Sequence, residues 1–265
     1  MTTRRPGVNS DFGWPVFLYK GPGGLNFFDV IFGHPEYQTL VVGHVEAAAG
    51  EQANGANGDP GAHGHAREFL AAVGYAAPCH WDGKTVEDLP PGWDHVILTA
   101  KRSLTDPGSV PPFTAMSALA VEVKAEHQGC GLSKLVLGNM KQIAERLGAN
   151  GLLAPIRPTI KPQYPLVDME DYIAWRLPDS KHPGREMVFD PWLRTHIRLG
   201  ARVLKVARAS CTVAAPVAEW EAWTGLRFLS SGPYTVPGGL VVLQVDLETG
   251  IATYRDGTNV VGGRT

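Results

Sequence analysis

The chain has 265 residues, of which 44% are hydrophobic and 19% are charged, and its formal net charge is -2. This composition is typical of a soluble globular protein with enough length for a sizeable core. The near-neutral charge provides no basic field to attract nucleic acid or an anionic membrane, so we expect neither as a partner. No apolar run approaches the ~20 residues of a membrane-spanning helix.

The three cysteines, Cys79, Cys130 and Cys211, are odd in number and far apart, which argues against a disulfide framework. The N-terminus lacks the charged and apolar regions of a signal peptide. We therefore expect a reducing, cytoplasmic setting. The sequence leaves the oligomeric state open, with a homodimer as one alternative.

The N-terminal third predicts short helical pieces and then a pair of strands. Residues 1–33 are rich in aromatic side chains but broken by Pro and Gly, which favours short helices packed over a sheet. Residues 37–45 and 68–78 have strand character and are expected to form a hairpin pair. The Gly-, Ala- and Asn-rich segment 47–65 between them predicts a flexible loop. Its His63 and His65 lack matched ligands, so we expect no metal site there.

The centre of the chain predicts a strand, a glycine loop and a helix. A short helix from Trp93 and a Pro/Gly loop lead to the apolar, β-branched strand 118–123. Apolar residues then recur at helical spacing over 132–147, and Gly148 provides a stop signal. Gly129 and Gly131 lie between strand and helix. A helix start carries unpaired N–H groups and partial positive charge, so this loop can hold a phosphate.

Two other glycine loops do not fit this segment. A P-loop requires Gly-Lys-Ser/Thr, but Leu132 follows Gly131. The dinucleotide fingerprint requires Gly or Ala where Lys134 stands. A plain glycine turn before a core helix remains the structural alternative.

Residues 123–133 read Val-Lys-Ala-Glu-His-Gln-Gly-Cys-Gly-Leu-Ser. This segment resembles the signature of the GNAT acyltransferase superfamily, Val-x-Pro-Glu-x-Gln/Arg-Gly-x-Gly-Leu/Ile-Gly/Ser. It departs from that pattern at Ala125, where proline is usual. The resemblance implies a GNAT fold of α/β class, with a mixed central sheet, helices on its flanks, and two parallel strands that splay apart at an acyl-CoA cleft. It also implies that acetyl-CoA or another acyl-CoA is the co-substrate, held by Val121, Val123, Gln128, Gly129, Cys130, Gly131, Leu132 and Ser133.

The next strand is expected at residues 151–156, parallel to strand 118–123 through a helical crossover. Arg157, Lys161 and Tyr164 follow it, in a proline-rich loop at the carboxyl end of a parallel strand. Ligands bind at such ends in open α/β sheets. We therefore note these three residues as candidates for the acceptor pocket or for phosphate contacts, with solvated loop charges as the alternative.

A helix is predicted from Pro191 to residue 199, with Asp190 as its N-cap, followed by strand 202–206. Its His196 stands four residues before Gly200, where GNAT proteins carry a tyrosine that protonates the leaving thiolate. The resemblance thus makes His196 a candidate proton donor. An imidazole could instead act as a base, orient the substrate, or be a packed structural group. Glu122 is the nearest carboxylate to the strand end and a candidate general base, although strand alternation could point it away, and deprotonation through water is equally compatible.

The resemblance divides the chain into a GNAT-like acyl-CoA-binding domain, residues 1–206, and a C-terminal extension, residues 207–265. The residue pattern of the extension predicts a helix near 217–223 and a hairpin of strands 240–245 and 251–254, packed on the same domain. The resemblance implies an N-acyltransferase that moves a small acyl group directly to an amine. Two alternatives stay open, namely a non-catalytic acyl-CoA sensor and a CoA-thioester hydrolase or decarboxylase on the same fold.

Overall fold

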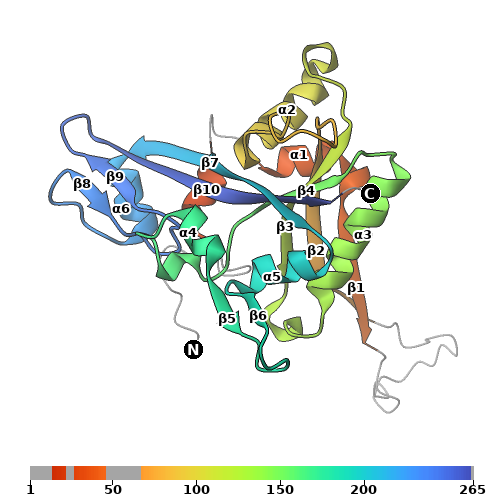
Figure 1. Ribbon diagram of the computed structural model, residues 1–265. Coiled ribbons are helices and arrows are strands. Elements are labelled where there is room, and N and C mark those ends of the chain that lie inside the picture. The colour runs from red at the N-terminus through yellow and green to blue at the C-terminus, as the bar shows by residue number, and fades with distance from the viewer. Residues whose placement is uncertain (1–13, 22–26, 46–66, 264–265) are drawn as a thin grey trace, which may run out of the picture.

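The computed structural model describes residues 14–21, 27–45 and 67–263. Within them the fold is α/β, with a mixed central sheet flanked by helices (Figure 1). Strand order is β1-β2-β3-β4-β10-β9-β8, and β7 pairs with β10. The strands are β1 (Thr39–Val45), β2 (Arg67–Cys79), β3 (Ala115–Val123), β4 (Leu152–Ile156), β7 (Arg202–Pro216), β8 (Gly232–Tyr234), β9 (Leu243–Asp246) and β10 (Ile251–Gly263), with a separate ribbon of β5 (Arg176–Pro178) and β6 (Glu186–Val188).

Helices connect the strands and cover both faces of the sheet (Figure 1). The α-helices are α1 (Phe27–Gly33), α2 (Trp93–Thr105), α3 (Leu132–Arg146), α4 (Met169–Ala174), α5 (Pro191–Arg198) and α6 (Val217–Thr224). Short 3-10 turns occur at η1 (Val16–Lys20), η3 (Pro35–Tyr37), η4 (Pro107–Ser109), η5 (Ala125–His127) and η6 (Lys161–Gln163).

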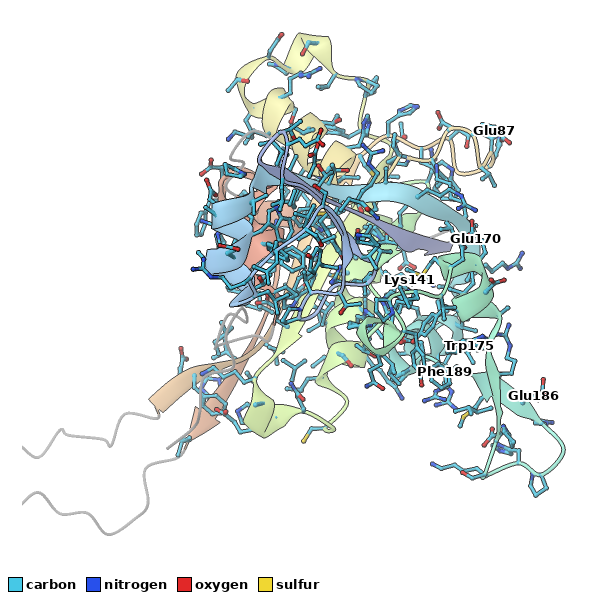
Figure 2. The ribbon with its side chains drawn as sticks, turned by 90° about the vertical axis from the view of Figure 1, so that its left-hand side faces the viewer. Glu87, Lys141, Glu170, Trp175, Glu186 and Phe189 are labelled. Atoms are coloured by element: carbon cyan, nitrogen blue, oxygen red, sulfur yellow. The ribbon has the colours of Figure 1, made fainter. Side chains whose placement is uncertain are left out.

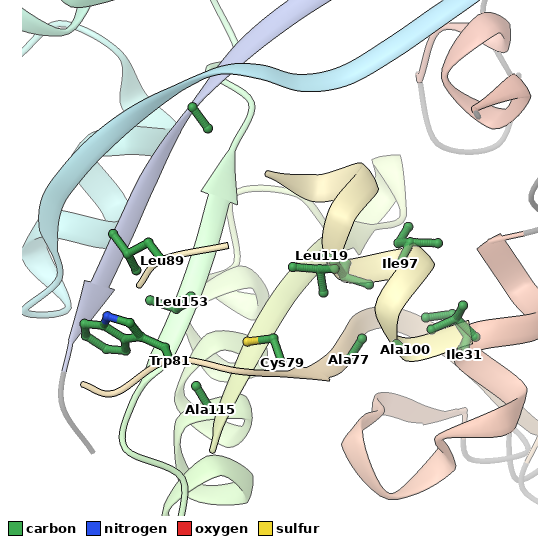
Figure 3. Packing of buried hydrophobic residues seen from close by; sticks show 13 residues of the cluster. Ile31, Ala77, Cys79, Trp81, Leu89, Ile97, Ala100, Ala115, Leu119 and Leu153 are labelled. Atoms are coloured by element: carbon green, nitrogen blue, oxygen red, sulfur yellow. The ribbon is translucent and has the colours of Figure 1, made fainter. Parts of the chain in front are cut away.

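Two hydrophobic layers hold the helices to the central strands. On one face, Ile97 and Ala100 of α2 pack with Ala77 of β2 and Leu119 of β3 (Figure 3). On the other, the α3 residues Val136, Leu137, Met140 and Ile143 and Leu193 of α5 pack over the same strands. Both faces of β3 are therefore buried, which explains the near-continuous apolar run in its sequence.

The predicted strand pairs and the main helices are confirmed. β1 pairs with β2 and β2 with β3, both antiparallel, and α3 begins directly after Gly131. At α5, the Asp190 carboxylate caps the helix by accepting hydrogen bonds from the N–H groups of Trp192 and Leu193, both at 3.0 Å. The whole of segment 47–65, including His63 and His65, lies outside the described residues.

The C-terminal strand β10 lies inside the main sheet. Its residues 259–263 pair with β4, and its opposite edge pairs with β7 over most of its length. The predicted boundary after residue 206 falls within β7, and residues 251–263 complete the sheet beside β4. The hairpin predicted near residues 240–254 is present as β9 and the start of β10. In the described ranges, no helix combines the length and apolarity needed to cross a membrane.

Candidate active site

The parallel strands β3 and β4 separate shortly after they begin. They pair only at Met116 with Leu152 and at Ser117 with Leu153, although β3 continues to Val123. This is the splay that the resemblance to the GNAT signature implies. A cavity of about 100 Å³ opens at the gap, lined by β3 residues 118–122 and β4 residues 154–156. Residues from both faces of the sheet reach it, so the gap connects the α3 side with the α2 side.

The glycine loop forms the start of α3 on one side of this gap. Gly129 and Gly131 have φ of +79° and +81°, a left-handed conformation that favours glycine. The amides of Leu132 and Ser133 have no acceptor among the described residues, and the first turn contains no acidic side chain. N–H groups and the positive end of a fifteen-residue helix therefore lie together, an arrangement that suits an anion.

Glu122 lines the cavity from the opposite face of the sheet. A β-bulge places it there, because Tyr75 pairs with Ala120 and Ala76 with Ala118, which leaves Leu119 as an extra residue in β3. Glu122 therefore lies opposite Val73 of β2. Val73 is two residues from Tyr75, so Glu122, Val73 and Tyr75 share the face of the sheet that α2 covers. Its side chain is buried, and burial raises the pKa of its carboxyl to about 7.

His196 reaches the same cavity from α5, on the α3 side. Its ring packs edge-on against Trp192, with 4.6 Å between ring centroids. The residue is only 5% exposed, and Nε2 has no hydrogen-bond partner within the described chain. Burial lowers the pKa of His196 to about 4, so the imidazole is neutral near pH 7. A neutral ring can donate or accept one hydrogen bond, but it is a poor source of a mobile proton.

Arg157 lines the cavity but is held by internal contacts. Its Nη1 donates to Asp256 Oδ2 at 2.5 Å and to the Tyr254 hydroxyl at 3.4 Å, and its Nη2 donates to the carbonyl of Gly238. Asp256 is fully buried in β10. The site predicted from the sequence does not include Asp256 and Tyr254. Their strand was expected to end at Tyr254, and the pairings of β10 that bring it beside Arg157 are long-range. No local signal in the sequence indicates this partnership.

The ion pair predicts a stability effect. Arg157→Met should lower the free energy of unfolding by ~3–5 kcal/mol, because it leaves the buried Asp256 carboxylate without its cation. Urea denaturation at pH 7 measures this change. Arg208→Met is the matched control, since Arg208 is 71% exposed and its ion pairs with Asp168 and Glu170 should contribute less than ~1 kcal/mol. Equal losses in the two variants would contradict the assignment.

Lys161 and Tyr164 lie away from the cavity. The buried Lys161 ammonium donates to the carbonyls of Tyr164 and Leu240, at 2.8 and 2.7 Å, and so ties the loop after β4 to the loop before β9. The Tyr164 ring packs edge-on against Trp175 and Phe189, which lie together beside the β5–β6 ribbon (Figure 2). Both side chains are therefore engaged by contacts within the protein.

The remaining candidates for chemistry are the cysteines. Cys130 is exposed at the tip of the glycine loop. Cys211 is buried and lines the cavity, and burial raises the pKa of its thiol far above the usual range, so no thiolate forms near neutral pH. Within the described residues, no group of three or more His, Cys, Asp or Glu side chains could hold a metal ion.

Comparison with known proteins bears on this arrangement. No family model matches the chain. The arginine N-acetyltransferase avaD of Aspergillus versicolor is 30% identical over 200 residues, which cover 71% of this chain and 68% of that protein. The chain belongs to the GNAT N-acetyltransferase superfamily. This GNAT protein is therefore an acyltransferase.

Two solved structures resemble this GNAT protein in fold. The loading GNATL domain of CurA from Lyngbya majuscula is 16% identical with a TM-score of 0.41, and the match covers 74% of this chain and 71% of that chain. The GphF GNAT-like decarboxylase, solved in complex with isobutyryl-CoA, is 14% identical with a TM-score of 0.46, over 95% of this chain and 88% of that chain.

Proposed function

We propose that this protein transfers an acyl group from an acyl-CoA directly to an amine. The observation that carries the proposal is the cavity through the β3–β4 gap, with the glycine loop and His196 on one face and Glu122 on the other. A thioester lying in this gap could be approached by an amine from the α2 side. The relative's activity as an N-acetyltransferase supports the same reaction class.

The donor would be held by main-chain groups. The amides at the start of α3 suit the pyrophosphate of coenzyme A, because they need no rearrangement to accept an anion. Within the described residues, the β3 edge beyond Ser117 has no strand partner on its β4 side, so main-chain groups of this edge could pair with the pantetheine arm. The N–H groups of residues 121–123 are the candidates for stabilising the thioester oxyanion.

Glu122 would act as the general base. An alkylammonium has a pKa near ~10, so it must lose a proton before it can attack a carbonyl. A carboxylate whose pKa is raised to about 7 is a stronger base than an ordinary glutamate and is still ionised for much of the time at neutral pH. Its place in the cavity supports proton removal directly or through one water.

His196 would act as a neutral hydrogen-bonding group. Because burial lowers its pKa to about 4, the ring carries too little imidazolium at pH 7 to serve as the main acid. One ring nitrogen could still orient the thioester or donate a hydrogen bond toward the departing sulfur. The proton for the thiolate would then come from the amine nitrogen through Glu122 or water.

Direct transfer predicts that Cys130 is dispensable. Cys130→Ala should retain at least about half of wild-type kcat, since the loop contributes amides and its exposed thiol lies outside the cavity lining. Steady-state kinetics with acetyl-CoA measure this. A large fall in turnover, with CoA binding intact and an acyl-enzyme trapped in the wild type, would establish a covalent route instead.

Thiol release tests the proposed function. The protein is incubated with acetyl-CoA, with and without an amine panel, while free thiol is recorded. We expect release that depends on amine. Amine-independent release would indicate a hydrolase, and no release with any amine or acyl-CoA would indicate a binding protein, so either result overturns the proposal.

A further inference from the structure

Two buried carboxylates lie on the α2 side, Asp256 in the cavity lining and Asp94 behind it. Asp94, in the first turn of α2, accepts a hydrogen bond from the Thr212 amide through Oδ2 at 2.7 Å. Asp256 lines the cavity and uses its Oδ2 for Arg157 and Tyr254. Thr212 follows Cys211, the cross-strand partner of Asp256, so β7 and β10 bring the two carboxylates together.

Each carboxylate keeps one unsatisfied oxygen. Asp94 is 9% exposed and Asp256 is 0% exposed, and the Oδ1 atoms of both are buried without a hydrogen-bond partner in the part of the chain that the structure describes. Such groups destabilise the fold unless something compensates them. A Cβ atom at Gly21 would lie 3.9 Å from Asp94 Oδ1, which places this oxygen beside the end of η1. Leu18 and Tyr19 of η1 line the cavity.

The local charge is negative. Among the described residues that line the cavity, Glu122 and Asp256 are the carboxylates and Arg157 is the permanent cation. Asp94 adds a third carboxyl behind them. Arg157 is already committed to Asp256 and Gly238. Mutual repulsion with Asp256 adds to burial in raising the pKa of Asp94 to about 6. A cationic ligand would relieve this repulsion and satisfy the open oxygens.

The cavity lining includes aromatic side chains. Trp14, Tyr19 and Trp93 line the same cavity. A planar, delocalised cation stacks on such rings and directs several N–H groups sideways to carboxylate oxygens. An ammonium is a compact point charge that is more strongly hydrated, so it gains less from this combination.

We propose that the amine acceptor carries a guanidinium group, which Asp94 and Asp256 bind while the amine nitrogen reaches Glu122. This inference rests on the proposed amine acylation. Asp94 and Asp256 would accept N–H groups from the guanidinium through their Oδ1 atoms, and the aromatic residues would cover its faces. The site thereby selects an alkylguanidine with a free amine over a simple alkylamine.

Agmatine, cadaverine and pentylamine test the assignment, because they share a primary amine and differ at the far end. With acetyl-CoA as donor, we expect kcat/KM for agmatine to exceed that for pentylamine by about 10–100-fold, as hydrogen bonds to charged groups allow. Asp94→Asn should reduce this ratio at least about 10-fold. Asp171→Asn, the same change at an exposed position of α4, should keep it. Equal use of agmatine and pentylamine, or equal use of agmatine and cadaverine, would overturn the guanidinium site.

Calorimetry separates this inference from the proposed function. Agmatine is titrated into the protein in the presence of coenzyme A, so that no turnover is required. Binding that Asp94→Asn weakens at least about 10-fold supports the guanidinium site even if no amine releases thiol. Absence of agmatine binding, or equal binding by the wild type and Asp94→Asn, overturns the site even if other amines are acylated. Thermal melting checks that Asp94→Asn is folded.

Discussion

Glu122→Gln is expected to lower kcat/KM for the amine by about 10²–10⁴-fold, the range for removal of a general base. The amide keeps the shape of the side chain but cannot accept the ammonium proton. The wild-type kcat/KM should rise with pH and reach half its plateau near pH 7, because Glu122 must be ionised and burial raises its pKa to about 7. The variant should lose this acidic limb. His196, with its pKa lowered to about 4, cannot account for it.

Stability provides an internal control for this variant. A carboxyl whose pKa is raised on folding binds more protons in the folded than in the unfolded protein, so its contribution to stability falls as pH rises from its ordinary range toward about 7. Glu122→Gln removes the buried charge and should melt at or above the wild-type temperature at pH 8. A folded variant with an unchanged rate and an unchanged pH profile would exclude Glu122 as the base.

Gly131→Glu should weaken acyl-CoA binding at least about 100-fold, because the added side chain would block the approach of the pyrophosphate to the loop amides and place a like charge beside it. Part of any effect could come from the strain of a side chain at φ +81°. Gly184→Glu reproduces that strain, since Gly184 also has φ +81° and open space around it, in an exposed loop beside the β5–β6 ribbon. The control should bind acyl-CoA normally. Calorimetry that finds equal affinity in the two variants would argue against the loop as the cofactor site.

The elements around the glycine loop were predictable because their signals are local. Apolar spacing marks α3, Asp190 marks the start of α5, and Gly129 and Gly131 occupy left-handed positions as the loop requires. The splay of β3 and β4 followed from the resemblance to GNAT proteins and not from any residue pattern.

The other half of the cavity was not predictable from local patterns. The place of β10 between β4 and β7 depends on pairings across more than a hundred residues, such as Asn259 with Ile156. The burial of Asp94 and Asp256 follows from that pairing. Regular strand alternation could have pointed Glu122 away from the cavity, but the bulge at Leu119 interrupts this alternation. Arg157, Lys161 and Tyr164 resemble ligand residues in sequence, but the contacts of their side chains are with the protein itself.

Product analysis with isotopically labelled acetyl-CoA tests direct acyl transfer to an amine most directly. The protein, the labelled donor and agmatine are combined, and mass spectrometry quantifies labelled amide, labelled acetate and any labelled protein. Direct transfer predicts labelled N-acetyl product in the same amount as the free thiol, with no acyl-enzyme. Labelled acetate in place of the amide would contradict amine acylation, and a labelled protein that later yields the amide would contradict direct transfer.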